Sequence, residues 1–436
     1  MARMSSPDAS VPDAPTPSAP SLLVRRWRVG LFSGLYLYQG LVAGFATTAL
    51  ANHFAATGFD AGAVGSFLAL VGLPWVLQPL LWGPLLDRAE SHPMGARRVW
   101  LVRALMGAQA SLGVLLILGG RPDPRAVGGV LLLHSLCASL ADTATDRMIV
   151  ASVPEGELGR VSACTRAGFV TGGAVGAALF AWLLPEAGFA AAAGVLLAFT
   201  SLLALVCGLV RERPGDALLR KRPPSPRARV GWVRRLADHL RHVTRVSAAF
   251  RTREAAGLLA LCFGIDFALA LFQVPFAVAL IRDHGWEADA LSRLQAGLAL
   301  LGGTVGAGLV GLGVDRAGPA RALFRLCLAC AVAFGLIALM ILMGLDARAG
   351  PMILGLSSVV PALLYVALLP TVVLASRSGG VSATQFQIFM ATMNLGDVAG
   401  AGLAGIIDQR VPAALTASGV GAVFLLCAVA RRPARC

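Results

Sequence analysis

Charged residues are scarce in this chain: they make up 14% of its 436 residues, whereas 57% are hydrophobic. That balance excludes an ordinary soluble globular protein, in which about a quarter of the residues are charged. Apolar runs of ~18 residues or more recur along the whole length, which is typical of membrane-spanning helices. Short alternating segments are few, so closely packed helices fit better than a membrane β-barrel.

The chain also lacks the motifs of several enzyme classes. It has no GxxxxGK[ST] loop, so nothing supports a nucleotide-driven pump. Its eight cysteines form no metal-ligand pattern, and no set of residues suggests a catalytic triad. Cys327 and Cys330 favour packing within a helix. We therefore expect a protein that is not an enzyme and that holds no metal or cofactor.

The net charge of +14 could indicate a nucleic-acid partner, but the basic residues cluster in the loops between apolar segments. The positive-inside rule puts them there. Arginines gather at both ends of the chain and in the even-numbered loops, whereas the odd-numbered loops carry few. We therefore expect both termini in the cytoplasm and no nucleic-acid partner.

About twelve spans fit the chain, at ~1.5 Å rise per residue across a ~30 Å apolar core. We predict an all-α integral membrane protein with two pseudo-symmetric six-helix bundles. The expected parts are a disordered cytoplasmic tail (1–22), a first bundle (23–210), a basic cytoplasmic linker (211–254), a second bundle (255–430) and a short cytoplasmic tail (431–436).

The basic linker has its own pattern. Residues 231–250 indicate a basic amphipathic helix, with Trp232, Leu236 and Leu240 on one face. Such a helix would lie on the anionic lipids of the inner leaflet. A solvated connection between the bundles is the alternative.

A short loop of the form Gly-x-x-x-Asp-Arg follows a long apolar segment at matching places in the two halves. An aspartate at a helix end can pair with arginines or with the positive end of a neighbouring helix. We interpret these loops as conformational gates that hold one side of a transporter shut in one state. The gating residues are Gly83, Asp87 and Arg88 in the first copy and Gly311, Asp315 and Arg316 in the second.

The halves also match in their small residues. Span five has Gly168, Gly172 and Gly176 at four-residue spacing. Span eleven, its counterpart, has Gly396, Gly400 and Ala404 at the same spacing. Such faces let two helix backbones approach closely.

Span four is the richest in polar groups. Ser135, Ser139, Asp142 and Asp146 form one continuous stripe on a helix. A charge in the membrane core costs at least ~2.5–3.5 kcal/mol, so each needs a reason. The stripe is either a proton or substrate site or part of a structural ion pair, and for Asp146, nearer the cytoplasmic end, an ion pair that locks the gate is favoured. The candidate partners for an ion pair are Arg147, Arg103 and Arg166.

Span seven carries Asp266 near its middle, with Gln273 two turns along on the same face and no basic residue nearby in sequence. Burial disfavours the charged form of a carboxyl group, so a buried carboxyl group can bind a proton near neutral pH. A proton-coupling site needs this property. Span eleven holds Asn394 and Asp397, and Asp397 could instead hydrogen-bond a neighbouring helix.

Span one contributes Tyr36 and Gln39 on one face. They could contact a polar solute, or the tyrosine could anchor the helix at the interface. His134 in span four favours a hydrogen-bonded packing residue over a titrating switch.

The repeated loop, the two sets of six spans and the basic linker resemble the major facilitator superfamily over essentially the whole chain. More specific stretches look like the AmpG muropeptide permease group, whose relatives include acetyl-CoA transporters and RhtX/FptX-type siderophore permeases. These stretches are Tyr38-Gln39-Gly40, Gly72 through Arg88, Ala141 through Asp146, and Ala383-Thr384-Gln385-Phe386.

The resemblance implies proton-driven uptake of a bulky polar solute across a bacterial inner membrane, and it places the Asp142/Asp146 pair on the group's acidic motif. One departure is Gln78, where the group usually carries a lysine. A siderophore transporter, importing or exporting, is therefore the alternative to muropeptide uptake.

We expect a monomeric secondary transporter whose partners are its small-molecule substrate, protons and the lipid bilayer. Asp142 and Asp266 would face a central cavity. A non-transporting receptor is the rival class, but a receptor would not need two gating loops.

Overall fold

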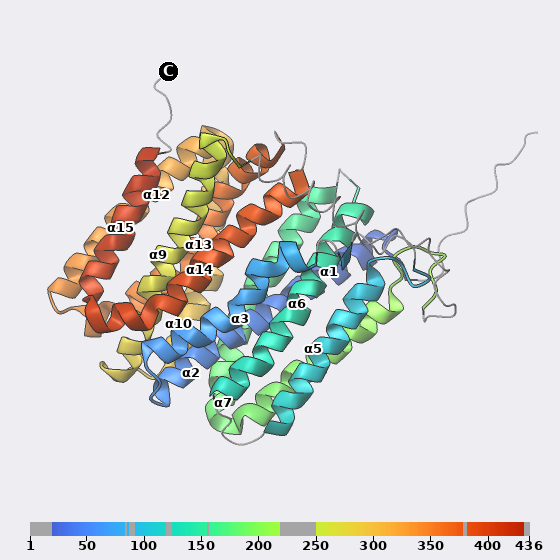
Figure 1. The fold of residues 1–436 in the computed structure, drawn as a ribbon, viewed down its shortest axis with the longest axis horizontal. Coiled ribbons are helices and arrows are strands. Elements are labelled where there is room, and N and C mark those ends of the chain that lie inside the picture. The colour runs from blue at the N-terminus through green and yellow to red at the C-terminus, as the bar shows by residue number, and fades with distance from the viewer. Residues whose placement is uncertain are drawn as a thin grey trace, which may run out of the picture.

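The computed structural model describes residues 20–82, 85–86, 92–118, 124–154, 157–218, 250–377 and 382–430. In these ranges the chain is helical, apart from turns and one isolated bridge (Figure 1). The first half contains α1 (Arg25–Ala43), η1 (Gly44–Ala49), α2 (Leu50–Ala56), α3 (Ala61–Leu81), α5 (Arg98–Leu118), α6 (Pro124–Ser152) and α7 (Leu158–Leu209). The second half contains α9 (Arg253–Arg282), α10 (Ala288–Leu301), η3 (Gly302–Gly306), α11 (Ala307–Ala317), α12 (Pro319–Leu342), α13 (Asp346–Arg377), α14 (Ser382–Arg410) and α15 (Ala413–Ala430).

The number of crossings agrees with the expected architecture. Eleven helices within the described ranges are long and apolar enough to cross a membrane. One of them, Cys164–Leu209, has 46 residues, about twice the ~20 that a crossing needs. Gly188, with φ of 76°, bends α7 just after Pro185. The fifth and sixth predicted spans are therefore the two arms of α7, and the total is twelve.

After the sixth crossing the chain returns to the end of the bundle where α1 begins. The amide of Leu22 donates to the carbonyl of Arg211 over 3.0 Å. Arg98, at the start of α5, is fully buried and donates to the carbonyls of Cys207 (3.0 Å) and Ala217 (2.9 Å). Because the number of crossings is even, both termini lie at this end of the molecule. We call it the termini end and the opposite one the far end.

Parts of the predicted tails and linker lie in this region. Residues 20–22 of the expected tail are described, and Ser21 and Leu22 are buried against the end of α7. Residues 211–218 of the expected linker pack beside α5, where Glu212 accepts hydrogen bonds from the backbone of Arg97 and Arg98. The amphipathic helix expected over 231–250, except its last residue, and the tail 431–436 lie outside the described residues.

Small residues bring two pairs of helices into backbone contact, one pair in each half. A Cβ added to Gly168 or Gly172 would meet the carbonyls of Ser33 or Leu37 on α1. In the second half, Gly396 lies against the Phe263 carbonyl on α9 and Gly400 against that of Phe267. Ala404 differs from the expected pattern, because it packs beside Gly65 of α3, in the other half.

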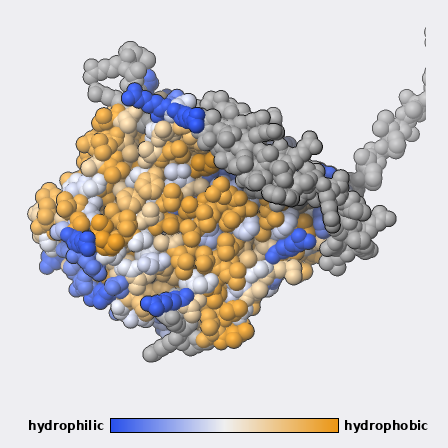
Figure 2. Space-filling model, in the orientation of Figure 1, coloured by the Kyte–Doolittle hydropathy of each residue, from blue (hydrophilic) through white to orange (hydrophobic). Residues whose placement is uncertain are grey.

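The outer surface is apolar. Figure 2 shows a face dominated by hydrophobic residues, with hydrophilic residues gathered in patches near its edges. Large aliphatic side chains such as Ile117 (85% exposed) and Val150 (81% exposed) point outward. Such a surface suits contact with lipid tails, because water would not stabilise it.

The two halves meet along α3 with α14 and along α7 with α10 (Figure 1). Close contacts between α3 and α14 begin at the far end, where Gly62 lies against Gly405. They continue to the middle, where Asn394 reaches the carbonyl of Trp75. Beyond that point toward the termini end, Leu80 is 66% exposed. The described contacts therefore pack the halves tightly at the far end, whereas Leu80, toward the termini end of α3, is exposed.

Candidate functional site

The acidic pair of α6 is held by neutral donors from two other helices. Asp142 accepts hydrogen bonds from the amide nitrogens of Gln39 on α1 and Gln78 on α3, both at 2.8 Å. Asp146 accepts from the hydroxyl of Tyr36 on α1 at 2.6 Å. The four-residue spacing of the aspartates matches the three-residue spacing of Tyr36 and Gln39, so one face of α1 serves both carboxylates.

The rest of the polar stripe on α6 also faces the bundle. The indole of Trp82 donates to the hydroxyl of Ser139 over 2.8 Å, and Gln78 also donates to Thr143 over 3.0 Å. Ser135 and Ser139 are buried. The stripe therefore meets polar partners on α3 and α1, and those partners are uncharged.

The ion-pair interpretation of the stripe finds no support among the described residues. Neither Asp142 nor Asp146 forms an ion pair with any of them. Arg103, one of the arginines considered as a partner, is exposed, and its guanidinium lies 5.0 Å from the ring centre of Trp100. The acid pair thus rests on amide and phenol donors in the part of the chain that the structure describes.

Arg166, another candidate partner, lies at the boundary between the halves. Its guanidinium carbon is 4.4 Å from the ring centre of Tyr365 on α13 and 5.7 Å from that of Phe169. Tyr36 lies within electrostatic range of Arg166, and both aspartates of α6 lie within electrostatic range of Tyr365. One cluster therefore joins α1, α6 and α7 of the first half to α13 of the second.

A second pair of carboxylates lies in the second half. Asp266 on α9 and Asp397 on α14 are close enough to interact electrostatically. Their helices meet where Gly396 and Gly400 pack on the α9 backbone. Among the residues described, neither carboxylate has an ion pair, and no hydrogen bond to either is present. Asp397 is exposed and Asp266 is half-buried.

Gln273, expected on the same face as Asp266, has a specific partner. Its amide nitrogen donates to the carbonyl of Ser357 on α13 over 2.9 Å. That carbonyl would normally accept from the residue four positions later, which is Pro361 and has no N–H. Gln273 thus replaces a helix hydrogen bond that proline removes, which matters where no water is present.

Asn394 plays the same part between the halves. Its side chain donates to the carbonyl of Trp75 over 3.4 Å, and the residue four positions after Trp75 is Pro79. A third instance supports the rule, because the indole of Trp286 donates over 3.0 Å to Ala347, four residues before a further proline of α13. The sequence shows where a proline leaves the carbonyl four residues before it without its helix donor. Only the fold shows which amide or indole side chain donates to that carbonyl instead.

The gating residues are described only in part. Gly83, Asp87 and Arg88 lie outside the described residues, as does the side chain of Asp315. Gly311 and the exposed Arg316 lie on α11, near the termini end. The role of these loops as gates stays a prediction.

Two further polar clusters are present, and only the first was not expected from sequence. The amide of Asn52 on α2 donates to Ser292 (2.8 Å) and Gln295 (2.9 Å) on α10, which joins the halves at the far end. Inside the first half, His134 lies within hydrogen-bonding distance of Tyr38 and is 1% exposed, which fits the packing role expected for it.

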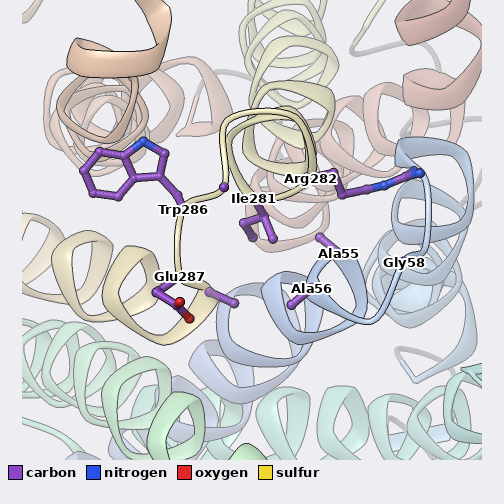
Figure 3. Close-up of a pocket in the computed structure, with 9 residues that line it drawn as sticks. Ala55, Ala56, Gly58, Ile281, Arg282, Trp286 and Glu287 are labelled. Atoms are coloured by element: carbon purple, nitrogen blue, oxygen red, sulfur yellow. The ribbon is translucent and has the colours of Figure 1, made fainter.

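A pocket of about 380 Å³ lies near the Asn52 cluster. Figure 3 shows it between Ala55, Ala56 and Gly58 of the first half and the segment from Ile281 to Glu287 that joins α9 to α10. It is open to the surface at the far end and contains none of the site residues predicted from sequence. We therefore place the candidate site at the α1–α6–α7–α13 cluster instead.

Tyr365 is the cluster member that sequence reasoning missed. It is one of three tyrosines in the chain and lies near the middle of α13. A rare aromatic hydroxyl in the middle of an apolar span could have marked it.

Two pseudo-symmetric bundles that enclose polar groups at their boundary define a membrane transporter. The sequence model of the Major Facilitator Superfamily matches residues 29–388, and the chain belongs to that family. Solved structures share the fold. A POT family transporter in complex with 5-aminolevulinic acid aligns with a TM-score of 0.67 and 12% identity over 95% of this chain and 98% of that one. The nucleoside transporter NupG aligns with a TM-score of 0.56 and 18% identity over 92% of this chain and 97% of that one.

Proposed function

We propose that this protein is a proton-coupled secondary transporter that moves a bulky polar solute across a bacterial inner membrane by alternating access. Both termini would face the cytoplasm, as the distribution of arginines indicates. The solute that we favour is a muropeptide-like molecule taken up into the cell. The Asp142/Asp146 pair and its uncharged donors are the observation that carries this proposal.

Uncharged donors suit a proton carrier. A carboxylate locked to an arginine would keep its charge in every state, because losing it would leave the arginine unpaired at a high cost. Among the described residues, Asp142 and Asp146 have amide and phenol donors only, so each can lose its charge without orphaning a buried cation there. The exchangeable proton would then change the charge at the boundary between the halves as the bundles rock.

The packing of the halves supports an alternating-access cycle. With the termini in the cytoplasm, the tight α3–α14 contact and the Asn52 cluster would close the outer side. The structure would then correspond to a state that closes this side and leaves the cytoplasmic side less tightly packed. The Asp87 and Asp315 loops would close the cytoplasmic side in the other state.

A siderophore is the second candidate solute. Gln78 occupies the position where the muropeptide permease group usually carries a lysine, and it binds Asp142 instead. That difference at the site is the specific reason for testing both solutes. Export is the alternative direction for a siderophore.

Uptake into oriented vesicles tests the proposal. We expect accumulation of labelled anhydro-muropeptide under an imposed pH gradient and its collapse on adding an uncoupler. Asp142→Asn and Asp266→Asn should each abolish gradient-driven accumulation, because neither variant can exchange a proton at that position. Accumulation of a ferric siderophore alone would transfer the assignment to metal acquisition.

Asp289→Asn is a matched control, because Asp289 forms a partly exposed helical pair with Arg293 outside the cluster. Such a pair contributes only about 0.3–0.5 kcal/mol, so transport by this variant should be unchanged. Normal accumulation in both Asp142→Asn and Asp266→Asn would contradict the assignment of proton coupling to these carboxylates.

A further inference from the structure

Arg166 is a cation held at the boundary between the halves, and the described residues give it no acidic partner. It lies on α7, and its guanidinium stacks on Tyr365 of the opposite half at 4.4 Å. Among the described residues no carboxylate lies within ion-pair distance of it. The nearest acidic groups of the cluster have other donors, since Asp142 is bound by Gln39 and Gln78.

Such a charge needs a compensating interaction. Placing an arginine in a membrane span is costly, because its charge loses the surrounding water. Stacking on an aromatic face offsets only part of that cost. It uses the flat face of the guanidinium and leaves the N–H groups at its edge available for an acceptor.

We propose that Arg166 binds an acidic group of the transported solute, so that the substrate class is carboxylated. This inference rests on the proposed transport function and specifies the chemical class of the transported solute. A guanidinium edge matches a carboxylate through two parallel hydrogen bonds, and this geometry distinguishes an acid from the corresponding amide. Tyr365 orients the guanidinium from the other half.

The arrangement divides two tasks between neighbouring groups. Arg166 takes the negative charge of the solute, while Asp142 and Asp146 are left for the proton. Because Arg166 and Tyr365 belong to different halves, binding a carboxylate at the guanidinium edge adjusts the contact between the halves at the same moment. Solute binding and bundle movement are thereby linked at one residue pair.

Equilibrium binding to the purified full chain in lipid nanodiscs tests this proposal, without any pH gradient. The probes are anhydro-muropeptide and its fully amidated form, together with a carboxylate-type ferric siderophore and an uncharged trihydroxamate one. We expect wild type to bind at least one acidic probe more tightly than its uncharged counterpart. Arg166→Gln should lose about tenfold or more in affinity for that acidic probe, with little change for the uncharged one. Arg166→Lys should retain part of the preference for the acid.

Arg103→Gln serves as the matched control, since Arg103 also stacks on an aromatic ring but is exposed outside the cluster. Its binding should equal that of wild type. The proposal is overturned if Arg166→Gln keeps the acid preference, if it loses both probes of a pair equally, or if wild type binds neither acidic probe. Because binding is read without a gradient, it can succeed where proton-driven accumulation fails, and the two failures are distinguishable.

Discussion

The two halves of the molecule pack their helices in the same way but differ in the hydrogen bonds to their acidic pairs. In each half, glycines of the fifth helix lie against backbone carbonyls of the first, as with Gly172 against Leu37 and Gly396 against Phe263. The acids of the first half have amide and phenol donors in place, whereas no hydrogen bond reaches Asp266 or Asp397 from the described residues. Repetition thus preserved the scaffold, while the polar groups inside it diverged.

That difference suggests a division of labour between the halves. The first half presents a preorganised site, because Tyr36, Gln39 and Gln78, all on helices of that half, already donate to its two carboxylates. Two neighbouring carboxylates that accept no hydrogen bonds repel each other when both are charged. The protonation of Asp266 and Asp397 should therefore depend more strongly on their surroundings than that of the first pair. Three further tests would break or sharpen this comparison.

The largest expected effect comes from breaking the shared scaffold. Gly172→Ala places a Cβ against the carbonyl of Leu37, and Gly396→Ala does the same against Phe263. Because backbone atoms cannot move aside cheaply, each should cost about 1–3 kcal/mol of the free energy of unfolding, measured by thermal or denaturant unfolding in detergent. The control is Gly194→Ala, which has no atom within 4 Å of the added Cβ. It should be neutral or stabilising by up to about 1 kcal/mol. Equal stability of all three variants would contradict the packing argument.

A smaller effect should separate the proline-carbonyl contact inside the second half from the one between the halves. Gln273→Ala removes a contact between α9 and α13 and should lower stability by about 0.6–2 kcal/mol. Asn394→Ala removes a longer contact to Trp75 across the boundary. It should change the distribution of open and closed states, read by cross-linking or spin-label distances between α3 and α14, more than it changes the unfolding temperature. The reverse pattern would show that Asn394 serves folding instead.

The smallest effect concerns Asp216, which lies outside the membrane spans, beside the end of α7. Partial burial raises the pKa of its carboxyl group, although the Arg213 amide donates to it over 2.8 Å and partly opposes this shift. The folded chain therefore binds this proton more tightly than the unfolded chain, and stability falls as pH rises through the interval between the two pKa values. Asp216→Asn should remove that decrease, so its stability relative to wild type should improve as pH rises. Parallel pH profiles for the two proteins would refute this expectation.

Much of the architecture could be predicted from the sequence, because membrane spans leave strong signals in length and hydropathy. The twelve crossings, the glycine faces of spans five and eleven and the shared face of Tyr36 and Gln39 all follow from simple periodicity. What could not be predicted were pairings between distant segments. Nothing near Arg166 in sequence points to Tyr365, and nothing near Asn52 points to Ser292.

Gln78 illustrates the same limit inside the site. Its sequence position suggested only that an expected cation is absent, whereas the structure gives it two hydrogen bonds, to Asp142 and Thr143. In the sequence, Gln78 marks only the absence of a lysine. In the structure it is a hydrogen-bond donor to α6.

The proline-carbonyl contacts have a consequence for how the chain is made. Trp286 and Gln273 precede the α13 carbonyls that they satisfy, so on a chain synthesised from its N-terminus both donors are in the membrane before α13 arrives. The Trp75 carbonyl has the opposite order, because its donor, Asn394, lies 319 residues later. The first half must therefore carry an open acceptor in its second span through most of synthesis. Nascent chains that stop before α14 should hold this helix less firmly than the finished protein does.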